Sequence, residues 1–219
     1  MSMKTEAFAA KKKRIPIILA ELDAIYTEAD CTLEFTDTLQ LLISTQLAAQ
    51  CTDARVNIVA QTLYQKYRTV DDFANADIAE LEQEIKSTGF FRNKARNIIL
   101  CCQKIIRDYN GSVPNTMEEL LTLPGVGRKT ANLVLGDAFH IPGIVVDTHT
   151  GRLSRRLGLT SETLPEKVEI DLMKILPRKS WTLFGHQLVL HGRAVCSARK
   201  PACDRCTLSE VCPKIGVVS

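Results

Sequence analysis

The segment Leu123–Thr148 reads LPGVGRKTANLVLGDAFHIPGIVVDT and sets the architecture expected for the whole chain. Pro124 fixes its own φ and disfavours helical geometry in the residue before it, so the preceding helix must end there. Gly125 and Gly127 permit φ > 0 and a close approach of the backbone to a partner. The next helix begins near Arg128, and the amides at its N-terminus favour an anion such as phosphate. Because many helix pairs are joined by glycine turns, a purely structural turn remains an alternative at this point.

The hydrophobic periodicity elsewhere is helical almost throughout, with no hairpin pair and no internal repeat. We therefore predict an all-α fold of roughly ten helices. Pro16 is compatible with the first turn of a helix over 15–26. Asp53, Asp147 and Ser180 are predicted to be N-caps. The expected helices lie at residues 15–26, 39–50, 54–67, 78–86, 92–109, 117–123, 128 onward, 148–157, 166–176 and 181–196.

The composition indicates a soluble globular protein with an uneven charge distribution. The 219 residues are 45% hydrophobic and 24% charged. No apolar run approaches the roughly 20 residues that a membrane-spanning helix needs, so we expect no membrane segment. Residues 128–219 carry 14 Lys and Arg against 8 Asp and Glu, whereas residues 1–127 carry 14 against 17. This asymmetry suggests that one face of the protein meets a polyanion.

Four cysteines near the C-terminus form the most specific chemical signal in the chain. Cys196, Cys203, Cys206 and Cys212 follow the spacing C-x6-C-x2-C-x5-C. Four thiolates that close together can surround one metal centre, and C-x2-C is a common chelating step. Zinc and an iron–sulfur cluster both use four thiolates, so the spacing alone leaves both open. The other four cysteines are scattered on apolar faces and are expected to be small core residues.

With the glycine turn and the cysteine set both in view, the chain resembles the endonuclease III family of DNA glycosylases. The resemblance rests on LPGVGRKTAN at 123–132, on VDTH at 146–149 and on the cysteine spacing, and it covers nearly the whole chain. It implies two helical domains: a six-helix unit with a helix–hairpin–helix motif at 31–140, and a 4Fe–4S cluster domain formed by 1–30 and 141–219. The four cysteines would then bind the cluster.

The resemblance also implies a role for individual residues. Lys129 matches the family's nucleophilic lysine, and Asp147 matches its catalytic aspartate. Gln50 aligns with a residue that fills the gap left by the extruded nucleotide, and Phe90 stands where the second wedge residue is often leucine. Phe90 is still apolar, so insertion into DNA is expected there too. The other residues expected to contact DNA are Gly125, Val126, Gly127, Arg128, His149, Arg199 and Lys200.

The implied activity is that of a bifunctional enzyme of base-excision repair. It would remove oxidised pyrimidines from duplex DNA through a lysine Schiff base and cleave the strand 3′ to the abasic site by β-elimination. The alternatives are a monofunctional mismatch glycosylase and a non-catalytic protein that binds damaged DNA. The expected partner is double-stranded DNA with damaged pyrimidines or abasic sites. We expect a monomer in the cytoplasm, associated with the nucleoid if the source is bacterial.

Overall fold

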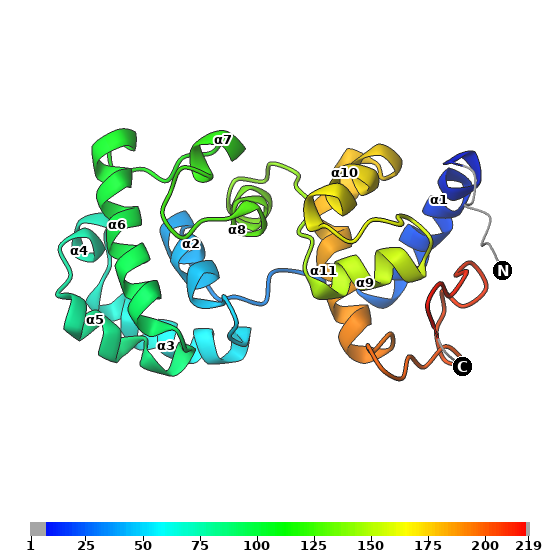
Figure 1. Ribbon diagram of the computed structural model, residues 1–219, viewed down its shortest axis with the longest axis horizontal. Helices are drawn as coiled ribbons and strands as arrows, with labels where there is room; N and C mark the ends of the chain where they lie inside the picture. The colour runs from blue at the N-terminus through cyan, green and yellow to red at the C-terminus, as the bar shows by residue number, and fades with distance from the viewer. Residues whose placement is uncertain (1–7, 218–219) are drawn as a thin grey trace. The chain divides into compact units, whose positions relative to one another are not determined.

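The computed structural model describes residues 8–217, and within this range every regular element is a helix (Figure 1). This confirms the predicted all-α fold. The α-helices are α1 Phe8–Ile25, α2 Thr38–Leu47, α3 Asp53–Lys66, α4 Val70–Ala74, α5 Ile78–Glu84, α6 Phe91–Tyr109, α7 Met117–Leu120, α8 Arg128–Leu133, α9 Thr148–Arg156, α10 Pro165–Ile175 and α11 Trp181–Ala194. Two 3₁₀ turns at Lys86–Thr88 (η1) and Arg178–Ser180 (η3) and a π-helical turn at Val134–Ala138 (η2) complete the set. No helix in the described part of the chain is long and apolar enough to cross a bilayer.

The chain divides into two compact units. Unit 1 contains the N-terminal segment up to Asp30 and the chain from Pro142 onward. Unit 2 contains Cys31–Ile141. Each unit has its own cluster of buried apolar side chains, so each is described by itself.

The core of unit 2 is built around α2. Leu41, Leu42 and Ile43 are fully buried, as expected for a helix that is apolar on most sides. The long helix α6 buries one face, which includes Ile98 and Ile105, and it packs along α4 and α5 (Figure 1). Burial of each such aliphatic side chain contributes roughly 1.5–3 kcal/mol, so this core is a firm support for the loops at its ends.

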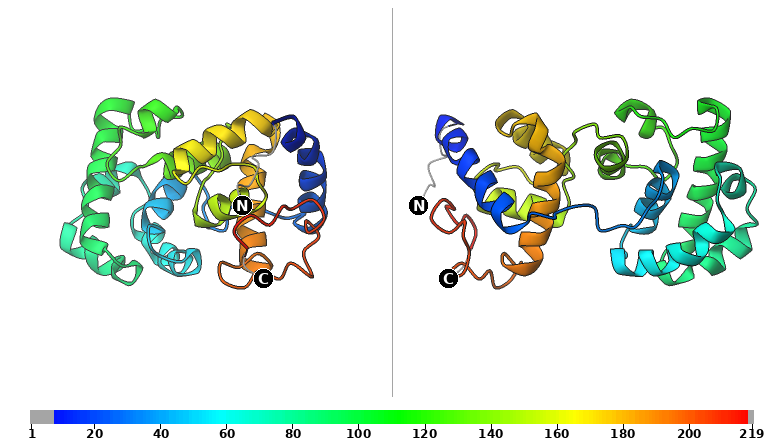
Figure 2. Two further views of the ribbon diagram at one scale, coloured as in Figure 1. Left: turned by 45° about the vertical axis from the view of Figure 1, so that its right-hand side comes forward. Right: turned by 180° about the vertical axis from the view of Figure 1, so that it is seen from behind.

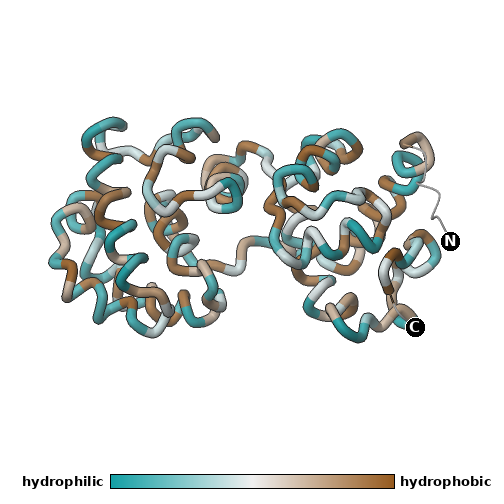
Figure 3. The backbone as a smooth tube through the Cα atoms, viewed as in Figure 1, coloured by the Kyte–Doolittle hydropathy of each residue, from teal (hydrophilic) through white to brown (hydrophobic). Residues whose placement is uncertain are grey.

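The core of unit 1 brings the two ends of the chain together. Ile18 and Leu22 of α1 are fully buried in the same cluster as Phe184 and Leu188 of α11. Figure 2 shows α1 beside the C-terminal helices of this unit in both views. Brown and teal segments alternate along the helices (Figure 3), as expected for helices that each bury one face.

Three details of the predicted helices were wrong. The first helix already includes Phe8, so Pro16 is exposed in the helix interior rather than lying in its first turn. Asp53 is the first residue of α3, and the N-cap is Thr52, whose hydroxyl accepts from the amide of Arg55. Ser180 is the N-cap residue of α11, as predicted, although its side chain makes no capping hydrogen bond. The five-residue helix α4, opened by a capping box, was missed because it is shorter than the periodicity can register.

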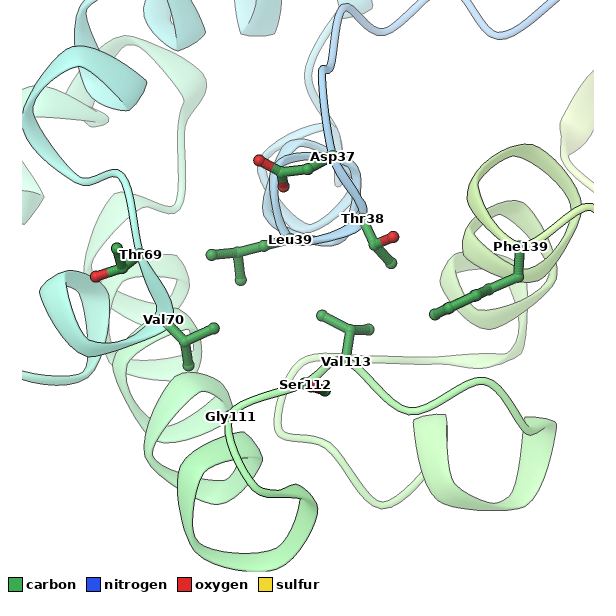
Figure 4. Close-up of a pocket in the computed structure, with 9 residues that line it drawn as sticks. All are labelled: Asp37, Thr38, Leu39, Thr69, Val70, Gly111, Ser112, Val113 and Phe139. Carbon is green, nitrogen blue, oxygen red and sulfur yellow. The ribbon is translucent and has the colours of Figure 1, made fainter.

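A shallow apolar hollow of about 390 Å³ lies at the N-terminal end of α2. Figure 4 shows Leu39, Val70 and Val113 pointing toward one another there, with Phe139 at the side. None of the residues predicted to act in catalysis or DNA binding lines it.

Candidate active site and metal centre

The glycine turn of unit 2 leads from α7 into α8. Gly125 has φ +76°, and a Cβ there would lie 2.6 Å from Gln46 Oε1 and 2.9 Å from Asn97 Cβ. Glycine is therefore required at this position for both conformation and space. Gly127 has φ −101°, so it does not use the left-handed conformation that glycine permits, and an added Cβ would meet nothing within 4 Å.

Val126 anchors the glycine turn in the core of unit 2, and α8 begins two residues later, at Arg128. The Val126 side chain is buried, with only 8% exposed, and packs in the core of unit 2, so only its main chain could meet a ligand. The N-cap of α8 is Gly127, which offers no side-chain oxygen to the first amides. A helix start without a side-chain cap suits an external anion as hydrogen-bond acceptor. Arg128 is half-buried and Lys129 is exposed in the first turn of this helix.

Asp147 is the N-cap of α9 in unit 1, as predicted. Its Oδ1 accepts a hydrogen bond from the amide of Thr150 at 2.8 Å, and its side chain is half-buried. The extended segment before it is fixed by burial of Ile144 and by close packing of Gly185 against Val145. The capping bond fixes the orientation of the carboxylate, so a cap and a chemical role are compatible.

His149 lies in the first turn of α9, against α11. Its Nδ1 is 3.2 Å from Arg152 Nη2. A Cβ added to Gly192 would lie 2.5 Å from the same Nδ1 of His149. Burial lowers the pKa of His149, partly offset by the carboxylate of Asp147. The structure thus places His149 between two helices as a half-buried side chain next to the aspartate.

Gln50 and Phe90 lie on one hollow of unit 2, although they are 40 residues apart in the chain. The hollow measures about 230 Å³ and is also lined by Gly125. Both residues adopt the left-handed conformation, with φ 54° at Gln50 and 49° at Phe90. Both side chains are exposed, and Phe90 exposes 63% of its surface. An apolar ring that exposed, next to an amide and a glycine turn, suits contact with another molecule.

The four C-terminal cysteines come together in the coil after α11. All four are half-buried free thiols. Burial raises the pKa of the Cys206 thiol, and the thiols of the other three cysteines raise it further. Such a group of mutually close sulfurs is a suitable donor set for a metal centre, because metal binding would remove the protons and the repulsion together.

Arg156 organises this coil and was not identified from the sequence. It is 92% buried, since 8% of its surface is exposed. Its guanidinium donates to Cys196 Sγ at 3.1 Å and to the carbonyl oxygens of Ser197 and Ala198 at 2.7 Å each. Hydrogen bonds to thiolate ligands are a common second layer of metal sites. Nothing in the sequence pattern distinguishes it, because Arg155 and Arg156 are both typical of exposed charges in the last turn of a helix.

Two more sulfurs have polar neighbours. The buried ring of His191 lies between Tyr26 Oη, 3.0 Å from Nδ1, and Cys206 Sγ, 3.4 Å from Nε2. The amide of Lys214 donates to Cys212 Sγ at 3.4 Å. The polar contacts to these sulfurs therefore come from α9, α11 and the C-terminal coil, all in unit 1.

Arg199 and Lys200 project from the turn between the first two cysteines. Both are exposed, as predicted. The turn is held by Ser197, whose Oγ accepts a hydrogen bond from the amide of Lys200 at 3.3 Å. Two cations on a short, anchored loop form a suitable contact for phosphate.

The chain matches proteins of known families over most of its length. The model of the HhH-GPD superfamily of base-excision DNA repair proteins matches residues 43–178. Endonuclease III of Synechocystis is 51% identical over 214 residues, which cover 97% of this chain and 98% of the relative. Endonuclease III of Bacillus subtilis is 43% identical over 202 residues, covering 91% and 92%.

Solved structures agree with these relatives. A non-covalent endonuclease III–DNA complex superposes with a TM-score of 0.88 at 45% identity, covering 93% of this chain and 95% of that one. A trapped covalent endonuclease III–DNA intermediate gives the same TM-score and identity and covers 93% and 96%. A thermostable thymine-DNA glycosylase, at 24% identity and a TM-score of 0.84, shares the fold. The chain belongs to the endonuclease III family of the HhH-GPD superfamily.

Proposed function

We propose that this chain is a bifunctional glycosylase and abasic-site lyase that removes oxidised pyrimidines from duplex DNA. The observation that carries the proposal is the likeness, at 45% identity over nearly the whole chain, to an endonuclease III trapped covalently on DNA. A covalent intermediate requires a nucleophile on the protein. This chain has an exposed lysine, Lys129, directly after the glycine turn. Together these observations favour the lyase over a monofunctional glycosylase or a passive DNA-binding protein.

The proposed reaction uses Lys129 and Asp147. The damaged base is stacked inside the duplex, so its nucleotide must first be extruded, at a cost of about a few kcal/mol. The neutral amine of Lys129 attacks C1′ of the sugar, and the N-glycosidic bond breaks as the base leaves. The C1′–O4′ bond of the sugar–lysine adduct then opens, with O4′ taking up a proton, and leaves an imine between C1′ and Lys129. This imine accepts the electrons released when the 2′ proton is lost, and the 3′ phosphate leaves by β-elimination. Water then hydrolyses the imine and frees Lys129.

Asp147 would support the charge that develops on the sugar as the base departs. A carboxylate can also accept the proton of the attacking amine. Its capping bond with the Thr150 amide holds it in place, and His149, in the first turn of α9, would support the same turn by packing against Gly192 of α11.

DNA binding would use the glycine turn, the two exposed side chains on the 230 Å³ hollow and basic residues. The main-chain amides at Gly125, Val126 and Gly127 would bind a backbone phosphate. Gln50 would fill the space of the extruded nucleotide, and Phe90 would wedge between neighbouring bases. The basic residues proposed to contact phosphates are Arg128, Arg199 and Lys200.

The cysteine set is proposed to bind a 4Fe–4S cluster as a structural group. The donor chemistry fits, because four cysteine thiols are the typical ligands of such clusters, and N–H groups of Arg156 and Lys214 donate to the sulfurs of Cys196 and Cys212. The bound cluster would supply the ligation that orders the C-terminal coil. Cys196, Cys203, Cys206 and Cys212 would each give one thiolate. Broad visible absorption of the purified protein would distinguish the cluster from zinc.

The test is borohydride trapping on a duplex that contains thymine glycol. We expect a covalent protein–DNA adduct with the wild-type chain and strand cleavage without borohydride. Lys129→Gln removes the amine but keeps a polar side chain of similar length, so adduct and cleavage should both vanish. Lys167→Gln serves as a matched control that removes one exposed lysine outside the proposed site and should still be trapped. Trapping of Lys129→Gln at the wild-type level, or no adduct with the wild type, would overturn the proposal.

A further inference from the structure

Lys94 of α6 is a buried cation that the proposed chemistry does not use. Only 6% of its surface is exposed, yet it ends in a group that water solvates strongly. Its Nζ donates to the carbonyl oxygen of Leu47 at 2.7 Å and to that of Thr88 at 2.8 Å. No carboxylate pairs with it in the described part of the chain. Burial accordingly lowers the pKa of Lys94.

The two carbonyl acceptors lie at the ends of two separate elements. Leu47 is the last residue of α2, and Thr88 is the last residue of η1. The final carbonyls of a helix have no partner within it, so an external donor can fix where the chain goes next. A single ammonium therefore bridges two loops that are far apart in the sequence.

Each of these loops turns into a left-handed residue within three positions. Gln50 follows Leu47 by three residues and Phe90 follows Thr88 by two, and their φ values are 54° and 49°. Left-handed geometry is unfavourable for residues other than glycine, so it persists only where the surroundings enforce it. Lys94 also lines the hollow that Gln50 and Phe90 share.

We infer that Lys94 is a positioning residue that sets the spacing of Gln50 and Phe90, so that both side chains are presented together to DNA. The inference rests on the proposed role of these two residues in filling and wedging the opened duplex. An apolar side chain of similar length would fill the same space without the cost of burying a charge. Lys94 adds two directional hydrogen bonds that no apolar residue can supply.

The experiment is a double-mutant cycle on DNA affinity. Lys94→Met is made in the wild-type chain and in the double variant Gln50→Ala/Phe90→Ala, each with its cofactor bound. Affinity is measured for a duplex with a tetrahydrofuran abasic analogue, and fluorescence of a 2-aminopurine beside the analogue reports unstacking. We expect Lys94→Met to weaken binding about tenfold in the wild-type chain and less than about twofold in the double variant, because coupled residues are not additive. The 2-aminopurine signal should fall with Lys94→Met as it does with the double variant.

Lys86→Met is the matched control, since Lys86 is an exposed lysine of η1 and its loss removes the same charge. It should change affinity equally in both backgrounds and leave the fluorescence signal intact. Lys94→Gln keeps a donor nitrogen on a shorter side chain and should give an intermediate loss of DNA affinity. It replaces Lys94→Met if that variant does not fold. An equal loss from the Lys94 change in both backgrounds would overturn the inference. In that case normal borohydride trapping of the wild type would leave the proposed function standing, whereas its failure would remove the function itself.

Discussion

Unit 2 and the C-terminal coil of unit 1 are ordered by different physical means. In unit 2, the helices that carry the glycine turn and the Gln50 and Phe90 loops rest on a continuous apolar core. In the coil after Ala194, Leu208 is the one apolar side chain of the described residues that joins the buried core. Four thiols and the hydrogen bonds of Arg156 take the place of apolar packing there.

The difference shows how one chain can hold two kinds of surface that we propose to face DNA. Loops on an apolar core are positioned by the folding of the unit itself, so their geometry exists before any ligand binds. The turn that carries Arg199 and Lys200 has little core beneath it, and we propose that its order depends on the cluster that the cysteines bind. The comparison predicts that removal of ligation and removal of core packing affect different parts of the molecule.

The largest effect is expected from Cys203→Ala. Loss of one ligand should abolish the visible absorption and release the coil 195–217, because a structural metal site supplies on the order of 10 kcal/mol of folding free energy. Hydrogen exchange should show lost protection in that coil while α6 of unit 2 stays protected. Cys102→Ala, at a buried core cysteine of unit 2, is the control and should keep the absorption. Lost protection in α6 as well would contradict the comparison.

The next largest effect is expected from Leu42→Ala. Leu42 is fully buried in α2, and the truncation should lower the free energy of unfolding of unit 2 by about 2–5 kcal/mol. Denaturant titration followed by circular dichroism measures this change. Iron content and visible absorption should not change. A variant that lost its iron under native conditions would show that the two regions are not stabilised separately.

A smaller effect is expected from Gly125→Ala. The added Cβ would clash with Gln46 and Asn97 and would occupy left-handed backbone, so the unfolding free energy should fall by about 1–3 kcal/mol. Gly127→Ala is the control for stability, since its φ is −101° and the space around it is open. Thermal melts of both variants test the contrast. Equal losses would mean that the approach of Gly125 to Gln46 does not constrain the turn.

The smallest effect concerns the pH dependence of unit 1. Burial lowers the pKa of His149 in the folded state below its ordinary value of 6.5, so the folded state binds fewer protons than the unfolded state. The resulting stability is present above about pH 6.5 and is lost as the pH falls through the folded value. His149→Gln should therefore flatten the fall in stability between about pH 7 and pH 5. Burial also lowers the pKa of His191, and this contribution cancels in the difference between the unfolding free energies of variant and wild type. Parallel curves of unfolding free energy against pH for the two proteins would contradict the prediction.

The features that could be predicted from the sequence are those set by neighbouring residues in the chain. The capping role of Asp147 and the turn at Pro124 and Gly125 follow from short-range backbone rules. The burial of Lys94 and Arg156 could not be predicted, since long charged side chains are usually exposed to solvent. Lys94 donates to one carbonyl 6 residues away and to another 47 residues away, and the carbonyl acceptors of Arg156 lie 40 or more residues away. Backbone carbonyls carry no sequence signature.

The left-handed geometry of Phe90 was also beyond the sequence, for a related reason. It follows Gly89, which has φ 73°, and the periodicity of the next helix says nothing about how the chain enters it. Conformations of this kind are set by tertiary contacts, in this case at the end of η1, rather than by the residue itself.

The most direct test of the central claim is peptide mapping of the borohydride-trapped adduct by mass spectrometry. We expect the sugar remnant to be attached to the Nζ of Lys129, in the peptide that follows the glycine turn. Lys129→Gln should give no adduct while it retains the wild-type melting temperature and visible absorption. A remnant attached to another lysine or to the N-terminal amine would contradict the assignment of the nucleophile.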